Sequence, residues 1–244
     1  MFRPSDLKQQ IRRAFRSIGF DISRYRFERT DAGMLNSTLH SFGIDLIVDV
    51  GANTGQYAMG VRSGGYKNRM VSFEPLTEAH ALLTANSSKD ALWDVYARCA
   101  VGNQDGEIEI NISGNSVSSS ILPMLAAHSD AAPESNYVSA ERTKIIRLDS
   151  VFGSLLRNEQ NSFLKIDTQG FEYEVLQGAS DSLEKIKAIQ LELSLVPLYK
   201  GQRLWNFLIE HLTRKGFSVW SFIPVFADTR TGRLLQMDAI LYRA

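Results

Sequence analysis

Residues 46–58, Leu-Ile-Val-Asp-Val-Gly-Ala-Asn-Thr-Gly-Gln-Tyr-Ala, place a buried-strand pattern directly before a glycine turn and the start of a helical pattern. Similar apolar, β-rich runs recur along the chain, and helical patterns of about 10 residues separate several of them. This alternation is typical of β-α-β units, which build a mainly parallel sheet with helices on both faces. The expected strands are 44–50, 70–73, 94–97, 163–166, 189–195, 217–222 and 237–242, and the expected helices are 54–63, 76–87, 171–180 and 202–215.

Two regions depart from this rhythm. Residues 106–147 begin with the alternating run Gly-Glu-Ile-Glu-Ile-Asn-Ile-Ser and continue through polar, turn-rich sequence. They predict an antiparallel insertion and a mobile loop over the site. Residues 1–34 form a basic helical extension, and residues 35–244 then make one α/β domain, a length that a single hydrophobic core supports.

The N-terminal extension is the most basic part of the chain. Its first 30 residues hold eight Lys or Arg and three acidic residues, and Leu7, Ile11, Phe15 and Ile18 recur at helical spacing. One interpretation is a surface helix packed on the main domain. The other is an amphipathic helix that contacts an anionic membrane surface.

The overall composition narrows the partners. The chain balances 27 basic against 27 acidic residues, which argues against nucleic acid. Its single cysteine, Cys99, cannot form an intramolecular disulfide, so we expect a cytoplasmic protein, with membrane association through the basic helix as the alternative. The four histidines lack metal-ligand spacing, which argues against a histidine zinc site.

The glycine turn after the first strand is suited to a nucleotide-like ligand. Gly51 and Gly55 lack a Cβ atom, so the backbone can approach a ligand closely. Their spacing differs from the G-x-G-x-x-G of dinucleotide sites and from the phosphate-binding P-loop. Asp49 would repel a pyrophosphate but suits an amine or a sulfonium, and Glu74 can accept hydrogen bonds from a ribose diol. These features favour S-adenosylmethionine (SAM) over NAD or ATP.

Several segments resemble, in order, the blocks of the FkbM-type methyltransferases: IVDVGANTGQYA, VSFEP, LDS, FLKIDTQGFEYEVLQGA, IQLELSLVPLY and TGRLLQMDAILYR. The resemblance covers residues 35–244. It implies a class I methyltransferase fold with a seven-stranded, mostly parallel Rossmann-like sheet, SAM as methyl donor, and O-methylation, often of sugar hydroxyls in glycolipids, polysaccharides or natural products. Gln169 stands where many members carry Glu, which puts in doubt a mechanism that needs a carboxylate there.

Two carboxylates are the candidate catalytic groups. Asp167 ends the fourth strand and Glu192 lies in the fifth, so both are expected to reach the crevice at the carboxyl ends of the strands. Asp167 can accept a hydroxyl proton, bind a divalent metal, hold the amino group of SAM, or cap the next helix. Glu192 is a second substrate or metal group, or a buried hydrogen-bond anchor, since a carboxylate in an apolar strand needs a partner.

The remaining predicted contacts come from the loops around this crevice. The predicted SAM-binding residues are Asp49, Gly51, Ala52, Asn53, Thr54, Gly55, Tyr57, Glu74, Pro75, Ala100, Ser119 and Asp167. The predicted substrate-binding residues are Gln169, Glu172, Tyr199 and His128. Asp238 is expected at the start of the last strand as a structural anchor, and Cys99 beside the adenine pocket.

These features together predict a SAM-dependent O-methyltransferase that acts on a sugar hydroxyl of a small molecule or glycolipid. An NAD-dependent oxidoreductase is the first alternative, but it would need the third glycine of G-x-G-x-x-G, which is absent. A non-catalytic SAM-binding domain is the second. It would show damage in the glycine turn or the Lys-Ile-Asp block, and both are intact.

Overall fold

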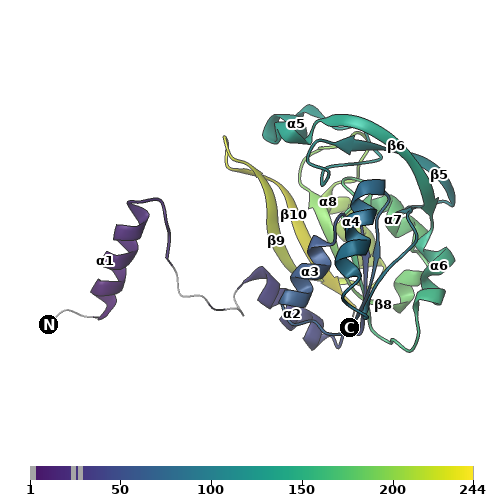
Figure 1. Cartoon of the computed structure of the whole chain (residues 1–244), viewed down its shortest axis with the longest axis horizontal. Coiled ribbons are helices and arrows are strands. Elements are labelled where there is room, and N and C mark those ends of the chain that lie inside the picture. The colour runs from purple at the N-terminus through teal and green to yellow at the C-terminus, as the bar shows by residue number, and fades with distance from the viewer. Residues whose placement is uncertain (1–3, 23–25, 27–29, 244) are drawn as a thin grey trace.

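The computed structural model describes residues 4–22, 26 and 30–243. The main sheet contains β1 (Leu46–Val50), β2 (Arg69–Phe73), β3 (Trp93–Val95), β7 (Ser162–Ile166), β8 (Ile186–Ser194), β9 (Ser218–Asp228) and β10 (Arg233–Tyr242). Its strand order is β3-β2-β1-β7-β8-β10-β9, and only β10 runs antiparallel to its neighbours (Figure 1). This confirms the predicted seven-stranded, mostly parallel α/β fold.

Helices cover both faces of this sheet, because successive side chains of each buried strand point to opposite faces. Leu46, Val48 and Val50 of β1 belong to the core under α6 (Leu148–Leu155), α7 (Glu172–Gly178) and α8 (Trp205–Arg214). Ile47 belongs to the core under α2 (Asp31–Ser41), α3 (Gln56–Ser63) and α4 (Thr77–Ser87). Asp49 therefore points to the same face as Ile47, toward α3.

The insertion forms a second sheet at the carboxyl ends of the parallel strands. It contains β4 (Ala100–Val101), β5 (Gly106–Ser113) and β6 (Tyr137–Ile146), and β5 pairs antiparallel with β6 as expected (Figure 1). Between them lie α5 (Ala126–Ala131) and a 3-10 turn at Pro133–Ser135. The predicted mobile loop is instead attached to the body, since Leu125 N–H donates to Leu198 O and Lys200 N–H to Pro123 O, both at 2.8 Å.

The hairpin of β9 and β10 is longer than the sequence pattern predicted. The outer part of β9 is mostly exposed, whereas Leu235 and Gln236 of β10 are buried, so pairing with β10 extends β9 beyond its apolar run. As a result Asp238 is not at the start of β10. It lies in the middle of the strand, directly opposite Glu192 of β8.

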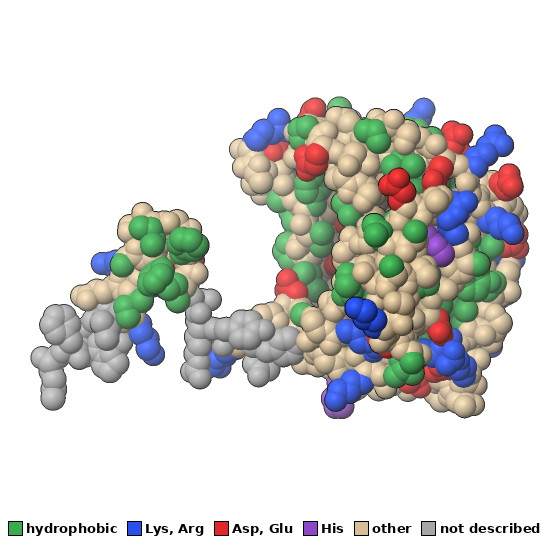
Figure 2. Space-filling model, viewed as in Figure 1, with side chains coloured by type: hydrophobic (Ala, Val, Ile, Leu, Met, Phe, Trp, Pro, Cys, Tyr) green, Lys and Arg blue, Asp and Glu red, His purple; other side chains and the backbone are tan. Residues whose placement is uncertain are grey.

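Helix α1 (Pro4–Arg16) lies apart from the body, and every described side chain from Lys8 to Ile22 is exposed (Figure 1). Figure 2 shows its hydrophobic side chains gathered together on the helix surface. This differs from the packed surface helix considered from the sequence. The next helix, α2, begins at Asp31 and so crosses the predicted domain boundary between residues 34 and 35. Within the described residues no helix is long and apolar enough to cross a membrane.

Candidate active site

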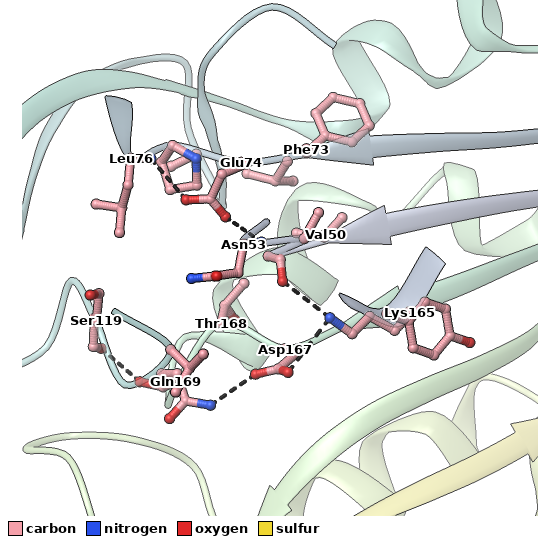
Figure 3. Close-up of a pocket in the computed structure, with 18 of the residues that line it drawn as sticks. Val50, Asn53, Phe73, Glu74, Leu76, Ser119, Lys165, Asp167, Thr168 and Gln169 are labelled. Atoms are coloured by element: carbon pink, nitrogen blue, oxygen red, sulfur yellow. Dashed lines mark hydrogen bonds and ion pairs between the residues drawn. The ribbon is translucent and has the colours of Figure 1, made fainter. Parts of the chain in front are cut away.

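A cavity of about 390 Å³ lies where the ends of β1, β2 and β7 meet the insertion (Figure 3). A cavity of this size suits a small-molecule ligand. The predicted SAM-binding residues that line it are Gly51, Ala52, Asn53, Tyr57, Glu74, Pro75, Ala100, Ser119 and Asp167, and Cys99 and Gln169 line it too. Asp49, Thr54 and Gly55 are not among its lining residues.

The two glycines of the turn are required by the protein's own packing. Gly51 has a φ of +78°, and a Cβ atom there would lie 1.8 Å from the carbonyl oxygen of Asp167. Gly55 has a φ of +93°, and its Cβ atom would lie 2.6 Å from the ring of Trp93. Both positions therefore exclude a side chain. The structure thus gives a different reason for these glycines than the predicted approach of backbone to ligand.

Glu74, at the end of β2, holds the β1–α3 turn against the β2–α4 turn. Its Oε2 accepts a hydrogen bond from Asn53 N–H at 2.7 Å, and its Oε1 accepts one from Leu76 N–H at 2.9 Å (Figure 3). The side chain is buried, and this burial raises the pKa of Glu74 to about 7. Each carboxylate oxygen keeps a lone pair for a further donor, so the geometry fits the two hydroxyls of a ribose.

A row of polar side chains crosses the sheet below the cavity. The row joins residues that are direct register neighbours on β2, β1, β7 and β8: Ser72, Asp49, Lys165 and Gln190. Two positions earlier on the same strands and the same face, the neighbours are all apolar: Met70, Ile47, Phe163 and Ala188. On this face of the sheet, the side chains thus change from apolar in one row to polar in the next. We call the second row, which lies nearer the cavity, the polar row.

Asp49 and Lys165 form the ionic centre of the polar row. Lys165 Nζ lies 3.2 Å from Asp49 Oδ1 and 3.5 Å from Asp167 Oδ2, and it donates a hydrogen bond to Gly51 O at 3.1 Å. Burial raises the pKa of Asp49. Burial alone would lower the pKa of Lys165, but the two carboxylates outweigh it and the pKa is raised. Asp49 is therefore held beneath the cavity wall.

Sequence reasoning missed Lys165, although a signal was present. Each of two buried strands, Leu-Ile-Val-Asp-Val and Ser-Phe-Leu-Lys-Ile, holds one charged residue at its fourth position. Because charges are buried in pairs, opposite charges at matching positions of two strands indicate both the pairing and its register.

Gln169 joins the two predicted catalytic carboxylates. Its Nε2 donates to Asp167 Oδ1 at 2.8 Å and to Glu192 Oε2 at 2.7 Å, while its Oε1 accepts from the hydroxyl of Tyr199 at 2.7 Å. Gln169 also has a φ of +53°, a strained value for a residue with a side chain. The structure therefore brings Asp167 and Glu192 together through an amide.

The two carboxylates differ in their access to the cavity. The Asp167 side chain is 37% exposed and lines the cavity. Glu192 is buried behind it, where Gln236 Nε2 donates to the same Oε2 at 2.6 Å. Burial, with the nearby charges of Asp167, Glu172 and Asp238, raises the pKa of Glu192 well above its ordinary range. Glu192 therefore supports the site from behind.

The other predicted substrate-binding residues do not line the cavity. Glu172 Oε1 accepts hydrogen bonds from Thr168 N–H, Thr168 Oγ1 and Gly170 N–H, so it closes the turn before α7. Tyr199 is buried behind Gln169. His128, on α5, packs its ring edge-on against Tyr199 at 5.2 Å, and burial lowers its pKa.

Gln190 and Asp238 also line the cavity, although neither was predicted as a ligand contact. Gln190 accepts from the hydroxyl of Tyr57 at 3.1 Å and donates to Asp238 Oδ2 at 2.8 Å. Burial raises the pKa of Asp238 to about 6. Asp238 could have been predicted from its position opposite Glu192 on the neighbouring strand. The predicted β10 was too short, so this pairing was not recognised.

The residues present do not fit a divalent metal between Asp167 and Glu192. The Gln169 amide places an N–H donor between these carboxylates, where a metal would need oxygen lone pairs. Lys165 occupies the other side of Asp167. In the part of the chain that the structure describes, no three Asp, Glu, His or Cys side chains form a group that could hold a metal.

The fold and this cavity define a SAM-dependent methyltransferase of class I. The chain belongs to the FkbM methyltransferase family, because the Methyltransferase FkbM domain matches residues 49–219. A curated relative is the AMB antimetabolite synthetase AmbE of Pseudomonas aeruginosa, which is 30% identical over 179 residues. That match covers 61% of this chain, and the chain spans only 8% of the length of that synthetase.

Solved structures with a similar arrangement have low sequence identity. The magnesium protoporphyrin IX methyltransferase of Synechocystis with bound SAM is 10% identical, with 97% of each chain covered and a TM-score of 0.49. The O-methyltransferase of Bacillus cereus in complex with SAH is 13% identical, with 100% of this chain and 93% of the other covered and a TM-score of 0.46.

Proposed function

We propose that this methyltransferase transfers a methyl group to a hydroxyl oxygen, that the acceptor is a sugar, and that Asp167 is the general base. The observation that carries the proposal is the position of Asp167. It is a partly exposed carboxylate at the edge of the cavity, held between Lys165 and Gln169. A sugar hydroxyl is a poor nucleophile, so a positioned base assists its attack.

The residues of the cavity divide between two tasks. When bound, SAM supplies a methyl group already activated by its positive sulfur. Glu74 would accept hydrogen bonds from the ribose, and Ala100 and Cys99 would contact the adenine. Asp167 would accept the proton of the acceptor hydroxyl when that oxygen receives the methyl group.

Lys165 and Gln169 act on Asp167 by fixing its orientation. Lys165 forms an ion pair with Oδ2 of Asp167 at 3.5 Å, and Gln169 donates a hydrogen bond to Oδ1 at 2.8 Å. The side chain is thereby held in one position before the acceptor arrives, and such alignment is a large part of what a methyl transfer needs from the protein. A role of Asp167 in holding the amino group of SAM would instead appear as a loss of SAM affinity on its replacement.

The test compares Asp167→Asn with the wild type and with Asp130→Asn, a control at an exposed position of α5. Methyl transfer from radiolabelled SAM is measured against neutral glycosides and glycolipids, with and without EDTA, and SAM affinity is measured by calorimetry. We expect Asp167→Asn to keep SAM affinity within about tenfold and to lose at least ~100-fold in turnover, the scale of a lost base. Turnover that survives in Asp167→Asn would show that Asp167 is not the base.

A further inference from the structure

The cavity as a whole is lined by carboxylates and amides and by almost no positive charge. The lining side chains of this kind are Asn53, Gln56, Glu74, Asp167, Gln169, Gln190 and Asp238. Among the described residues that line the cavity, Lys165 is the only lysine or arginine. This imbalance bears on which acceptors the site can accommodate.

Lys165 has no capacity left for an anionic ligand. It is 8% exposed, pairs with Asp49 and Asp167, and donates to Gly51 O. Its positive charge is thus surrounded by oxygen atoms of the protein. A phosphate or carboxylate on an acceptor would need to displace these partners, and Asp49 would then be buried without a counter-charge.

The carboxylates around the acceptor position come from three strands. Asp167 follows β7, Asp238 lies in β10, and Glu192 of β8 lies behind them. An anionic group beside the reacting hydroxyl would meet repulsion from Asp167 and Asp238, which line the cavity. Hydroxyl and ammonium groups, by contrast, are donors that match these carboxylates.

From this geometry we infer that the acceptor is a neutral glycoside or an amino sugar, without a phosphate or diphosphate beside the hydroxyl that is methylated. The inference rests on the proposed function, because it assumes that a sugar enters next to Asp167. Both N–H donors of Gln169 are used by Asp167 and Glu192, so its amide offers an acceptor hydroxyl only a lone pair on Oε1. The amide of Gln190 donates to Asp238 and accepts from Tyr57, so it keeps one N–H and one lone pair in a fixed orientation. Such groups select for stereochemistry, while the carboxylates select for charge.

A binding experiment tests this without turnover. Saturation-transfer NMR on the protein saturated with SAH is run with four mixtures: methyl glycosides, amino glycosides, sugar monophosphates and nucleoside diphosphate sugars. We expect binding in the first or second mixture, at least tenfold stronger than in the other two. Equal or stronger binding of the phosphorylated mixtures overturns the inference, and so does the absence of binding by every neutral and amino glycoside.

The variant Asp238→Asn separates charge from shape. We expect it to lower the preference for amino over neutral glycosides about tenfold and to leave SAH affinity within threefold. An unchanged preference would contradict the role given to the carboxylate cluster. Failure of the proposed function would look different, because glycosides would then bind as expected while Asp167→Asn retained full turnover.

A second inference comes independently from helix α1. The large apolar side chains that the structure describes in this helix and in the turn that follows it are all exposed: Ile11 45%, Phe15 40%, Ile18 66%, Phe20 65% and Ile22 42%. Ile11, Phe15 and Ile18 are spaced to share one helix face. The chain then reverses at Gly19, where Phe20 N–H donates to Phe15 O at 2.9 Å, which brings the end of the helix and the turn together.

Basic residues flank this apolar face. Residues 8–22 contain Lys8, Arg12, Arg13 and Arg16 against a single acid, Asp21. Asp21 pairs with Arg12 at 2.8 Å and with Arg16 at 3.1 Å. Lys8 and Arg13 have no acidic partner within the described residues. Lys8 borders the apolar face, so its charge can reach anionic headgroups when that face is buried.

We propose that α1 and its turn dock on an anionic membrane surface. The probes are vesicles of phosphatidylcholine alone and vesicles with added phosphatidylglycerol, in co-sedimentation at low and high salt. We expect at least tenfold stronger binding to the anionic vesicles, weakened by salt. Equal binding to both vesicles, or to neither, overturns the proposal.

Matched variants place the binding on α1. Phe15→Glu with Ile18→Glu should reduce vesicle binding at least tenfold, whereas Leu82→Glu, at a 56% exposed position of α4, should not. Because the side chains of α1 that the structure describes are all exposed, the double variant should keep its melting temperature and its SAM affinity. A lower melting temperature, or a change from dimer to monomer in light scattering, would mean that the apolar face covers protein instead.

Discussion

The ammonium group of Lys165 lies 3.2 Å from the carboxylate of Asp49, in a layer of the sheet where the side chains are 8% and 0% exposed. The two residues are register neighbours on adjacent parallel strands. Lys165 also contacts Asp167 and the carbonyl of Gly51. One buried cation therefore connects strand β1, the glycine turn that follows it and the candidate base. The geometry of the cavity floor therefore depends on this ion pair.

Replacing Lys165 with Met should destabilise the protein severely. Asp49 would remain fully buried without its counter-charge, and breaking a buried pair in this way costs about 3–5 kcal/mol. Urea unfolding gives the free energy directly, with Lys144→Met on exposed β6 as the control. The double variant Asp49→Asn with Lys165→Met should recover part of the loss. A loss below about 1 kcal/mol in the single variant would show that Asp49 does not depend on Lys165.

Strand periodicity in the sequence predicted the regular part of the fold but not its exceptions. Strand periodicity predicted the seven strands, since each buried strand is a short apolar run bounded by turns. It failed in the outer part of the β9–β10 hairpin, where pairing extends both strands beyond the apolar runs that predicted them, and this misplaced Asp238. It also missed the helical turn at α5, which is fixed by contacts with Leu198 and Lys200.

The candidate site was predicted in outline. Residues at strand ends, such as Glu74 and Asp167, were found because parallel strands deliver them to one edge of the sheet. Residues whose position depends on side-chain hydrogen-bond networks were not predicted correctly. Tyr199 is held behind Gln169 by its hydroxyl, and Glu172 is used by its own turn, and neither contact leaves a trace in spacing or composition.

Gly51→Ala should disrupt the site, whereas Gly60→Ala should not. A Cβ atom at residue 51 would overlap the carbonyl of Asp167, so the ends of β1 and β7 must separate. Gly60 lies within α3 and a Cβ atom there meets nothing within 4 Å, so alanine should stabilise the helix by about 0.5–1 kcal/mol. Thermal unfolding and SAM calorimetry of both variants check this. If Gly51→Ala bound SAM as well as the wild type, the tight contact would be irrelevant to the site.

Gln169→Glu should impair turnover at neutral pH and less at high pH. The substitution replaces a donor shared by Asp167 and Glu192 with a third carboxyl. Asp167 also faces Lys165 on β7 and the carboxyls of Asp49, Glu172 and Asp238, so the added negative charge is opposed by one cation alone. The shared proton would hold the base in its acid form until higher pH.

The measurement for Gln169→Glu is the pH dependence of kcat between about pH 6 and 9. We expect at least a tenfold loss near pH 7 that shrinks toward pH 9, with SAM affinity within threefold of the wild type. Gln177→Glu, at an exposed position of α7, is the matched control. A loss of equal size at every pH would indicate a purely structural role for Gln169.

Protein stability should decrease as pH rises through the range set by Glu74. Its pKa is about 7 in the folded protein and 4.5 in its ordinary state, so the folded protein retains a proton that the unfolded chain releases between these values. Stability contributed by that proton is complete below about pH 4.5 and is lost by about pH 7. Glu74→Gln removes this dependence. The free energy of unfolding of Glu74→Gln minus that of the wild type should therefore increase by roughly 3 kcal/mol between about pH 4.5 and about pH 7. Urea unfolding at several pH values measures this difference. A constant difference would show that Glu74 titrates normally.

A calorimetric titration of SAM into the wild type, Glu74→Ala and the exposed α4 control Glu78→Ala tests most directly whether this cavity binds SAM through Glu74. We expect one SAM site in the wild type and no NAD binding. We expect the affinity of Glu74→Ala for SAM to fall by ~1–3 kcal/mol, roughly 5- to 150-fold, because the hydrogen bonds of the Glu74 carboxylate are lost. Glu78→Ala should match the wild type. Unchanged SAM affinity in Glu74→Ala would remove Glu74 from the ribose site, and a wild type that does not bind SAM would rule out the cavity as a SAM site.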